Sequence, residues 1–91
     1  MIKQSYGYVY ILKSSRNETY YIGSTQNIEK RLEKHNTGLV KSTCNIRPLI
    51  LVFYQKYNTI PQARQIEYKL KRLKSRKIIE QIITDGCIKV K

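Results

Sequence analysis

Residues 6–23 read YGYVYILKSSRNETYYIG, and this stretch decides the fold. Its two ends, 6–13 and 19–23, are rich in aromatic and β-branched side chains, and polar residues lie between them. This pattern predicts a β-hairpin near the start of the chain. A turn with an even number of residues would place Tyr10 and Tyr21 on the same face of the hairpin, because paired residues share a face. The sequence leaves the register of the two strands open.

A helix is expected directly after the hairpin. Three residues there can cap a helix: Ser24, Thr25 and Asn27. Ile28 and Leu32 follow at helical spacing, which predicts a helix from about Ile28 to Asn36. On a helical wheel His35 falls close to the Ile28/Leu32 face and Arg31 lies on its flank. Arg31 and His35 are therefore neighbours, one turn apart.

A third strand is predicted over LILVFYQKY, residues 49–57, which follows Pro48. Its apolar residues run together without alternation, and the sequence around Pro61 breaks the pattern afterwards. A continuous apolar run is typical of a strand that is buried on both sides. We therefore expect this strand to lie at the centre of the sheet.

Two more helices complete the predicted order. Pro61 favours a helix start, and apolar residues then recur at helical spacing: Ala63, Ile66, Leu70 and Leu73. Ser75 caps a further helix that ends at Asp85 and Gly86, with four isoleucines on one face: Ile78, Ile79, Ile82 and Ile83. The order is β-β-α-β-α-α, an α+β fold with a small three-stranded antiparallel sheet flanked by helices. One domain over residues 1–91 is expected, with its core at about 6–84.

The charge of the chain points to a polyanionic partner. Among 91 residues, 18 are Lys or Arg and 6 are Asp or Glu, so the formal net charge is +12. Nucleic acid is favoured over a membrane, because the apolar run from Pro48 to Tyr54 is too short to span a bilayer. Charge alone is also compatible with ribosomal and tail-binding modules.

The cysteines argue against a zinc site. Cys44 and Cys87 are far apart in the sequence, and His35 is the one histidine of the chain, so no Cys/His zinc motif is formed. Residues 1–5 lack the apolar stretch of a secretion signal, which favours reduced thiols and a cytoplasmic protein. A structural disulfide remains an alternative.

Two tyrosine motifs carry a family resemblance. Tyr8-Val9-Tyr10 and Tyr21-Ile22-Gly23 resemble the two halves of the GIY-YIG nuclease signature. Residues 23–38, GSTQNIEKRLEKHNTG, are similar to the same region in short single-domain members, and the match extends from about Tyr8 to Arg76. It includes Arg31, eight residues after Gly23, then His35 and Glu67. The resemblance implies the GIY-YIG endonuclease fold and hydrolysis of phosphodiester bonds.

Glu67 is the metal ligand that the resemblance implies. Its carboxylate is a hard oxygen donor suited to one Mg²⁺ or Mn²⁺ ion. Glu67 is also the only acidic residue between Lys34 and Ile79, and it lies about 80° from the centre of the apolar stripe of its helix, at the border between core and solvent. The alternative is an ordinary helical ion pair with Lys71 or Arg64.

The other candidate catalytic residues have distinct expected roles. The planar fork of Arg31 suits phosphoryl oxygens and would neutralise charge in the transition state. By resemblance, Tyr10 activates water, with its pKa lowered by Arg31 and a metal-bound water, and Tyr21 places water or phosphate. His35 would serve as a proton shuttle or as a donor to phosphate. Each of these side chains also has a structural alternative, as a packing or solvated residue.

A cluster of cations on and after the second predicted helix would track a phosphate backbone. Its members are Arg64, Lys69, Lys71, Arg72, Lys74, Arg76 and Lys77. Ser24 and Thr25 would add hydrogen bonds to phosphate, although capping of the first helix explains them as well. A solvated helix face is the alternative for the cations.

The sequence therefore predicts a metal-dependent endonuclease that acts on DNA rather than RNA, with structure-directed or weak specificity. A protein partner would supply further specificity, because no second domain is present to do so. Two departures from the family pattern favour an alternative, a non-catalytic nucleic-acid-binding module with the same fold. Ser24 stands where the excision-repair branch tends to carry lysine, and no asparagine follows Asn58.

Overall fold

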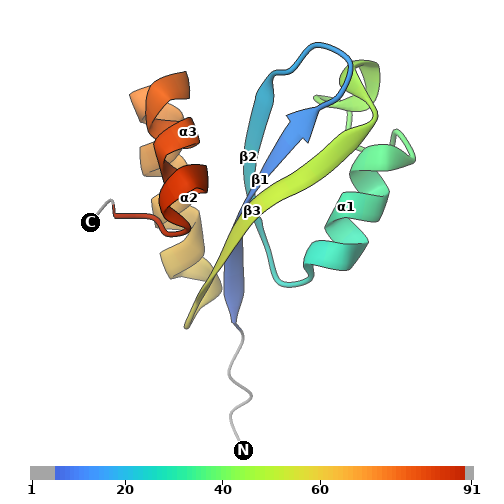
Figure 1. The fold of residues 1–91 in the computed structure, drawn as a ribbon. Coiled ribbons are helices and arrows are strands. Elements are labelled where there is room, and N and C mark those ends of the chain that lie inside the picture. Colours follow the sequence, from blue (N-terminus) through green and yellow to red (C-terminus); the bar gives the residue numbers. More distant parts are fainter. Residues whose placement is uncertain (1–5, 90–91) are drawn as a thin grey trace, which may run out of the picture.

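A computed structural model describes residues 6–89, with elements in the order β-β-α-β-α-α (Figure 1). The strands are β1 (Gly7–Ser14), β2 (Tyr20–Thr25) and β3 (Leu49–Tyr57). The helices are α1 (Ile28–Asn36), α2 (Ile60–Leu73) and α3 (Arg76–Asp85), with a short 3₁₀ turn, η1 (Cys44–Ile46), before β3. The predicted fold class and element order are confirmed. Residues 1–5, which bear on the secretion signal, lie outside the described part.

The three strands form one antiparallel sheet in the order β2-β1-β3. β1 is therefore the central strand, and the prediction that β3 lies at the centre was wrong. The register changes between Ile11 and Leu12, which face Phe53 and Leu51 of β3. Val52 is thereby left as an extra residue, a bulge that shifts the alternation of the strand. Apolar side chains of β3 pack on both faces of the sheet, Val52 and Phe53 in one hydrophobic cluster and Leu49 and Leu51 in the other, although the strand lies at the edge.

The hairpin register places both tyrosines of the signature on one face of the sheet. Tyr10 of β1 lies opposite Gly23 of β2, and Leu12 lies opposite Tyr21. Since side chains two residues apart point the same way, Tyr10 and Tyr21 share a face and lie diagonally across the strand pair. The register that the sequence left open is thus the one that places both tyrosines on a common face.

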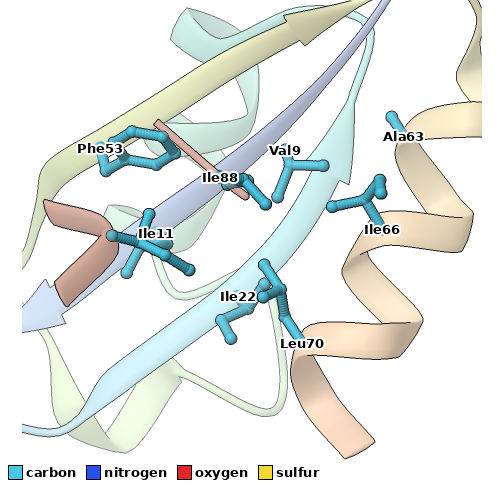
Figure 2. Packing of buried hydrophobic residues seen from close by; sticks show 9 residues of the cluster. Val9, Ile11, Ile22, Phe53, Ala63, Ile66, Leu70 and Ile88 are labelled. Carbon is cyan, nitrogen blue, oxygen red and sulfur yellow. The ribbon is translucent and has the colours of Figure 1, made fainter. Parts of the chain in front are cut away.

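Helices cover both faces of the sheet, α1 on one side and α2 with α3 on the other (Figure 1). The larger hydrophobic cluster lies under α2 and α3 (Figure 2): Val9, Ile11, Ile22, Phe53, Ala63, Ile66, Leu70, Ile82 and Ile88. A smaller one, formed by Tyr10, Leu12 and Leu49 with the half-buried Leu32, lies on the α1 side. The predicted apolar helix faces are not buried throughout: Leu73 is 46% exposed and Ile78 is 36% exposed, and each lies near one end of its helix.

Side-chain caps fix where the helices begin. Asn27 accepts a hydrogen bond from the Lys30 backbone at the start of α1, and Thr59 does the same for α2, one residue before Ile60. Ser75 caps α3 after Lys74 has turned the chain through a left-handed conformation. These caps orient α1 and α2, which bring the candidate catalytic side chains to the sheet. Within residues 6–89, no helix has both the length and the apolar character that a membrane span requires.

Candidate active site

A buried hydrogen-bonded pair connects β1 with α1. The Tyr10 hydroxyl lies 3.0 Å from His35 Nε2, although the two residues are 25 positions apart. Tyr10 is 2% exposed and His35 is fully buried. The sequence predicted that His35 lies close to the apolar face of its helix, and in the structure its side chain is fully buried. Full burial makes His35 unavailable as a direct donor to phosphate and leaves the proton-shuttle role.

Gly23 provides the space that the Tyr10 side chain occupies. Tyr10 lies directly opposite Gly23 in the hairpin, on the same face. A Cβ atom at position 23 would overlap the hydroxyl and Cζ of Tyr10, and it would come within 2.9 Å of Cε2. The glycine is required here for close approach and not for its backbone conformation.

His35 also contacts a residue that sequence reasoning missed. Its Nδ1 atom lies 2.7 Å from the Thr43 hydroxyl, and Thr43 is fully buried. Thr43 belongs to the loop between α1 and β3, in a segment with no motif or periodicity, so no sequence signal pointed to it. Tyr10, His35 and Thr43 together form a continuous buried chain of hydrogen bonds.

Tyr21 completes an aromatic group around His35. The two ring centroids lie 4.9 Å apart in an edge-to-face arrangement, and the Tyr10 and Tyr21 rings are 6.5 Å apart. Tyr21 is only half-buried, on the edge strand β2, and the Lys71 ammonium of α2 lies 5.5 Å from its ring centroid. Tyr21 therefore connects the buried chain on the α1 side with α2 on the opposite face.

The electrostatics of the buried pair differ from the expectation. Burial raises the pKa of Tyr10 well above its ordinary value, Tyr21 and Glu67 act in the same direction, and Arg31 opposes them with too little effect. Arg31 acts in the predicted direction, but burial outweighs it and the pKa of Tyr10 is raised. Burial, helped by the Arg31 charge, lowers the pKa of His35. The pair is a protonated phenol beside a neutral imidazole.

Glu67 lies on α2 and reaches across the edge of the sheet to β2. Its Oε1 accepts a short hydrogen bond from the Ser24 hydroxyl, and its Oε2 lies 2.6 Å from Lys71 Nζ. The Glu67 side chain is 19% exposed and that of Lys71 is 47% exposed. The helical ion pair considered as an alternative is thus present, together with a bond to a residue of the tyrosine-motif strand.

The donor set around Glu67 suits a divalent ion of the magnesium type. Two carboxylate oxygens and the Ser24 hydroxyl are hard oxygen donors, and the Glu67 side chain is partly open to solvent. Across residues 6–89 no group of three or more His, Cys, Asp or Glu side chains gathers as a metal site. Any metal at Glu67 therefore depends on this one carboxylate, and it competes with the Lys71 ammonium for Oε2.

Beside these residues lies a hollow of about 470 Å³ that we call the basic groove. Its lining comes from the end of β2, from α1 and from the start of α2: Ser24, Thr25, Gln26, Asn27, Lys30, Arg31, Lys34, Ile60 and Arg64. Four of these side chains are cationic. The structure thus brings together four of the residues singled out from the sequence: Ser24, Thr25, Arg31 and Arg64. Lys30 and Lys34 were missed because, on an amphipathic helix, they read as an ordinary solvated face.

The other predicted phosphate-binding cations lie outside the basic groove. Arg76 donates to the Glu18 carbonyl at 2.8 Å and pairs with Glu80 at 3.3 Å, and Arg72 lies 5.7 Å from the Tyr68 ring centroid. Lys69 and Lys74 are exposed and do not line the groove either. The basic residues of α2 therefore divide between the groove, through Arg64, and other parts of the surface.

Comparison with known proteins places this chain in a nuclease-type family. The model of the GIY-YIG catalytic domain matches residues 6–79. The chain belongs to the GIY-YIG family.

Among its relatives are the small UPF0213 proteins. One from Clostridium perfringens is 37% identical over 83 residues, which cover 90% of this chain and 87% of the relative. One from Bacillus licheniformis is 42% identical over 79 residues, covering 86% and 79% respectively. The solution NMR structure of a UPF0213 protein from Bacillus halodurans is similar with a TM-score of 0.55 and 32% identity, covering 87% of this chain and 83% of that one.

Proposed function

We propose that this protein is a metal-dependent endonuclease that hydrolyses phosphodiester bonds of DNA. The observation that carries the proposal is the meeting of side chains from both faces of the sheet at the β2 edge. Tyr10, Tyr21 and His35 come from one side, Glu67 comes from the other, and the four cations of the basic groove lie next to them. Membership of a nuclease-type family supports the same conclusion.

The proton path of the reaction runs through the buried pair. As a water molecule attacks phosphorus, its proton passes to the Tyr10 oxygen while the Tyr10 hydroxyl proton passes to His35 Nε2, 3.0 Å away. Tyr10 then stays neutral throughout, which suits a phenol whose pKa burial has raised. His35 becomes the cation during this step, against the burial and the Arg31 charge that lower its pKa in the free protein, and Tyr21 orients the water or phosphate.

Arg31 meets the charge on the phosphoryl oxygens, and Glu67 would hold a metal ion beside it. Arg31 lines the basic groove, and its fork can donate two parallel hydrogen bonds to phosphate oxygens. Glu67, with Ser24 behind it, would hold one Mg²⁺ or Mn²⁺. When bound, this ion supplies Lewis-acid stabilisation of the phosphoryl and leaving-group oxygens.

The substrate class follows from the groove. Lys30, Lys34 and Arg64 are backbone-directed cations that hold phosphates without reading bases. Binding is therefore weakly specific or directed by the shape of the nucleic acid. We propose DNA in preference to RNA, with further cations on α2 and after it steering the strand: Lys69, Lys71, Arg72, Lys74 and Arg76. A protein partner would provide any tighter specificity.

One observation favours a second candidate, a nucleic-acid-binding module without catalysis. Glu67 Oε2 lies 2.6 Å from the Lys71 ammonium, so the negative charge that would attract a metal is already neutralised. In this reading the ion pair is permanent and the basic groove binds DNA without cutting it.

The test compares DNA nicking with DNA binding. Wild-type protein with Mg²⁺ or Mn²⁺ should nick supercoiled plasmid, and Glu67→Ala should abolish nicking while retaining DNA affinity. Glu80→Ala is the matched control, because Glu80 also pairs with a cation one helical turn away but contacts Arg76 and Tyr20 instead of the groove residue Ser24. Undiminished nicking by Glu67→Ala would refute the role of Glu67. No cleavage of any DNA or RNA by the wild type would favour the binding module.

A further inference from the structure

We propose that Thr43 is a positioning residue that holds His35 in the tautomer with its proton on Nδ1. In that tautomer Nε2 carries a lone pair and can accept the proton of Tyr10. The inference deepens the proposed function and rests on it for the role of the proton path. The tautomer itself is a property of the protein without DNA or metal, and can be measured separately.

The hydrogen bond between Thr43 and Val40, the last in the buried series, bears on the directions of the others. The Thr43 hydroxyl lies 2.7 Å from His35 Nδ1 and 3.4 Å from the Val40 carbonyl oxygen. A carbonyl only accepts, so when the hydroxyl hydrogen goes to Val40 the hydroxyl oxygen is left to accept from Nδ1–H. Neutral imidazole carries one proton, which leaves Nε2 as the acceptor for the Tyr10 hydroxyl at 3.0 Å.

The opposite tautomer, with the proton on Nε2, leaves one hydrogen-bond donor unsatisfied. With the proton on Nε2, the imidazole would donate to Tyr10 and the Thr43 hydroxyl would donate to Nδ1. The hydroxyl hydrogen of Tyr10 would then lack a protein acceptor within residues 6–89, since His35 is the hydrogen-bond partner of that hydroxyl. Tyr10 is 2% exposed, so an unpaired hydroxyl hydrogen there is costly. The first arrangement satisfies every donor.

Burial makes the contribution of Thr43 decisive. His35 and Thr43 are both fully buried, so solvent does not choose between the tautomers. The other groups near the imidazole are Tyr10 of β1, Tyr21 of β2 and Arg31 of α1. None of them accepts a hydrogen bond from Nδ1. Thr43 is therefore the group that selects the protonated nitrogen.

The loop that carries Thr43 is anchored at its far end. Thr43 immediately precedes η1, whose Ile46 carbonyl accepts a 2.6 Å hydrogen bond from the Ser14 hydroxyl of β1. The Asn36 side chain bonds both backbone groups of Leu49, at 3.0 Å and 2.7 Å. These bonds anchor the loop between α1 and β3 at both ends. The Thr43 hydroxyl is therefore held in position beside the imidazole.

The experiment is a long-range ¹H–¹⁵N correlation spectrum of the imidazole. Because His35 is the one histidine of the chain, its two ring nitrogens give an unambiguous pair of signals. Wild-type protein at neutral pH should show a protonated, pyrrole-type Nδ1 and an unprotonated, pyridine-type Nε2. A protonated Nε2 in the wild type would overturn the proposal without any variant.

Two variants separate the hydroxyl from the volume of the side chain. Thr43→Val keeps the shape and should lose the Nδ1–H tautomer, giving a mixture or the Nε2–H form, with nicking reduced about 100-fold because the proton path is interrupted. Thr43→Ser keeps the hydroxyl and should retain both the spectrum and the activity within a few-fold. A Thr43→Val protein that keeps the Nδ1–H form would overturn the proposal.

The two proposals fail in different ways. Amide spectra of each variant show whether it folds. If Thr43→Val does not fold, the imidazole spectra of the wild type and Thr43→Ser decide the tautomer. If Thr43→Val changes the tautomer while the wild type never cleaves DNA, the positioning role of Thr43 stands and the nuclease function fails. If the wild type cleaves but carries Nε2–H, the nuclease function stands and the role of Thr43 fails.

Discussion

Replacing Gly23 with alanine should disable the site through the single atom that it adds. The new Cβ would overlap the hydroxyl end of Tyr10 and lie 2.9 Å from its Cε2. Carbon atoms in contact prefer about 3.5–4.0 Å, so the ring must retreat by roughly 1 Å. Tyr10 bonds His35 at 3.0 Å, and a movement of this size breaks that bond.

The magnitude follows from the groups that are disturbed. Overpacking costs about 1–3 kcal/mol, and leaving a buried hydrogen-bonding pair unmatched costs about 1–3 kcal/mol more. We expect Gly23→Ala to lower the free energy of unfolding by roughly 2–6 kcal/mol. A misplacement of about 1 Å in a catalytic group typically reduces the rate about 100-fold, so nicking should fall at least that far.

The assay is urea unfolding together with plasmid nicking at a temperature where the variant is folded. Gly86→Ala is the matched control: Gly86 has φ of 75°, and an added Cβ would meet nothing within 4 Å. Its cost of about 1–2 kcal/mol is backbone strain alone, and its nicking should equal that of the wild type. Nicking by folded Gly23→Ala at the wild-type rate would refute the reasoning, because Tyr10 would then not need its position over Gly23.

Three further outcomes are expected. Arg31→Lys should reduce cleavage, measured by nicking, about 100-fold or more, because an ammonium lacks the paired donors of the guanidinium. DNA affinity, measured by fluorescence anisotropy, should change little. Equal cleavage rates would contradict the role assigned to Arg31. Lys30→Ala with Lys34→Ala should reduce the slope of log affinity against log salt by about 2, whereas Lys89→Ala outside the groove should leave it unchanged. The free energy of unfolding should fall as the pH drops below about 6.5, since the unfolded state binds a proton at the ordinary histidine pKa while the pKa of buried His35 is lower. His35→Gln, measured by urea unfolding, should lack this contribution. Identical pH profiles of the two proteins would contradict the assignment to His35.

Local sequence patterns were sufficient for the hairpin and for α1. The alternation around Tyr10 and Tyr21 and the cap at Asn27 act over a few residues, so the bounds of α1 were predicted as observed. The position of β3 was predicted wrongly because strand order depends on pairing between distant segments. The apolar run of β3 packs on both faces of the sheet although the strand lies at its edge, so this pattern did not indicate a central position.

The candidate site was predictable where a motif names the residue, and less so where tertiary structure creates the role. The short distances between Tyr10, His35 and Tyr21 agree with the residues selected from the sequence. The raised pKa of Tyr10 reflects burial, which the sequence does not report. Thr43 and the groove residue Lys34 acquire their surroundings when α1, its following loop and the sheet come together, so neither carried a distinguishing pattern.

The proposed activity requires both hydrophobic clusters, on the two faces of the sheet, to be folded. Tyr10 and His35 depend on the cluster beneath α1, whereas Glu67 depends on the one beneath α2 and α3. A nascent or partly melted chain with one face formed lacks either the proton path or the carboxylate. Hydrolytic capacity then appears only with the complete tertiary structure, so incompletely folded copies of a strongly basic protein can adhere to DNA without cutting it.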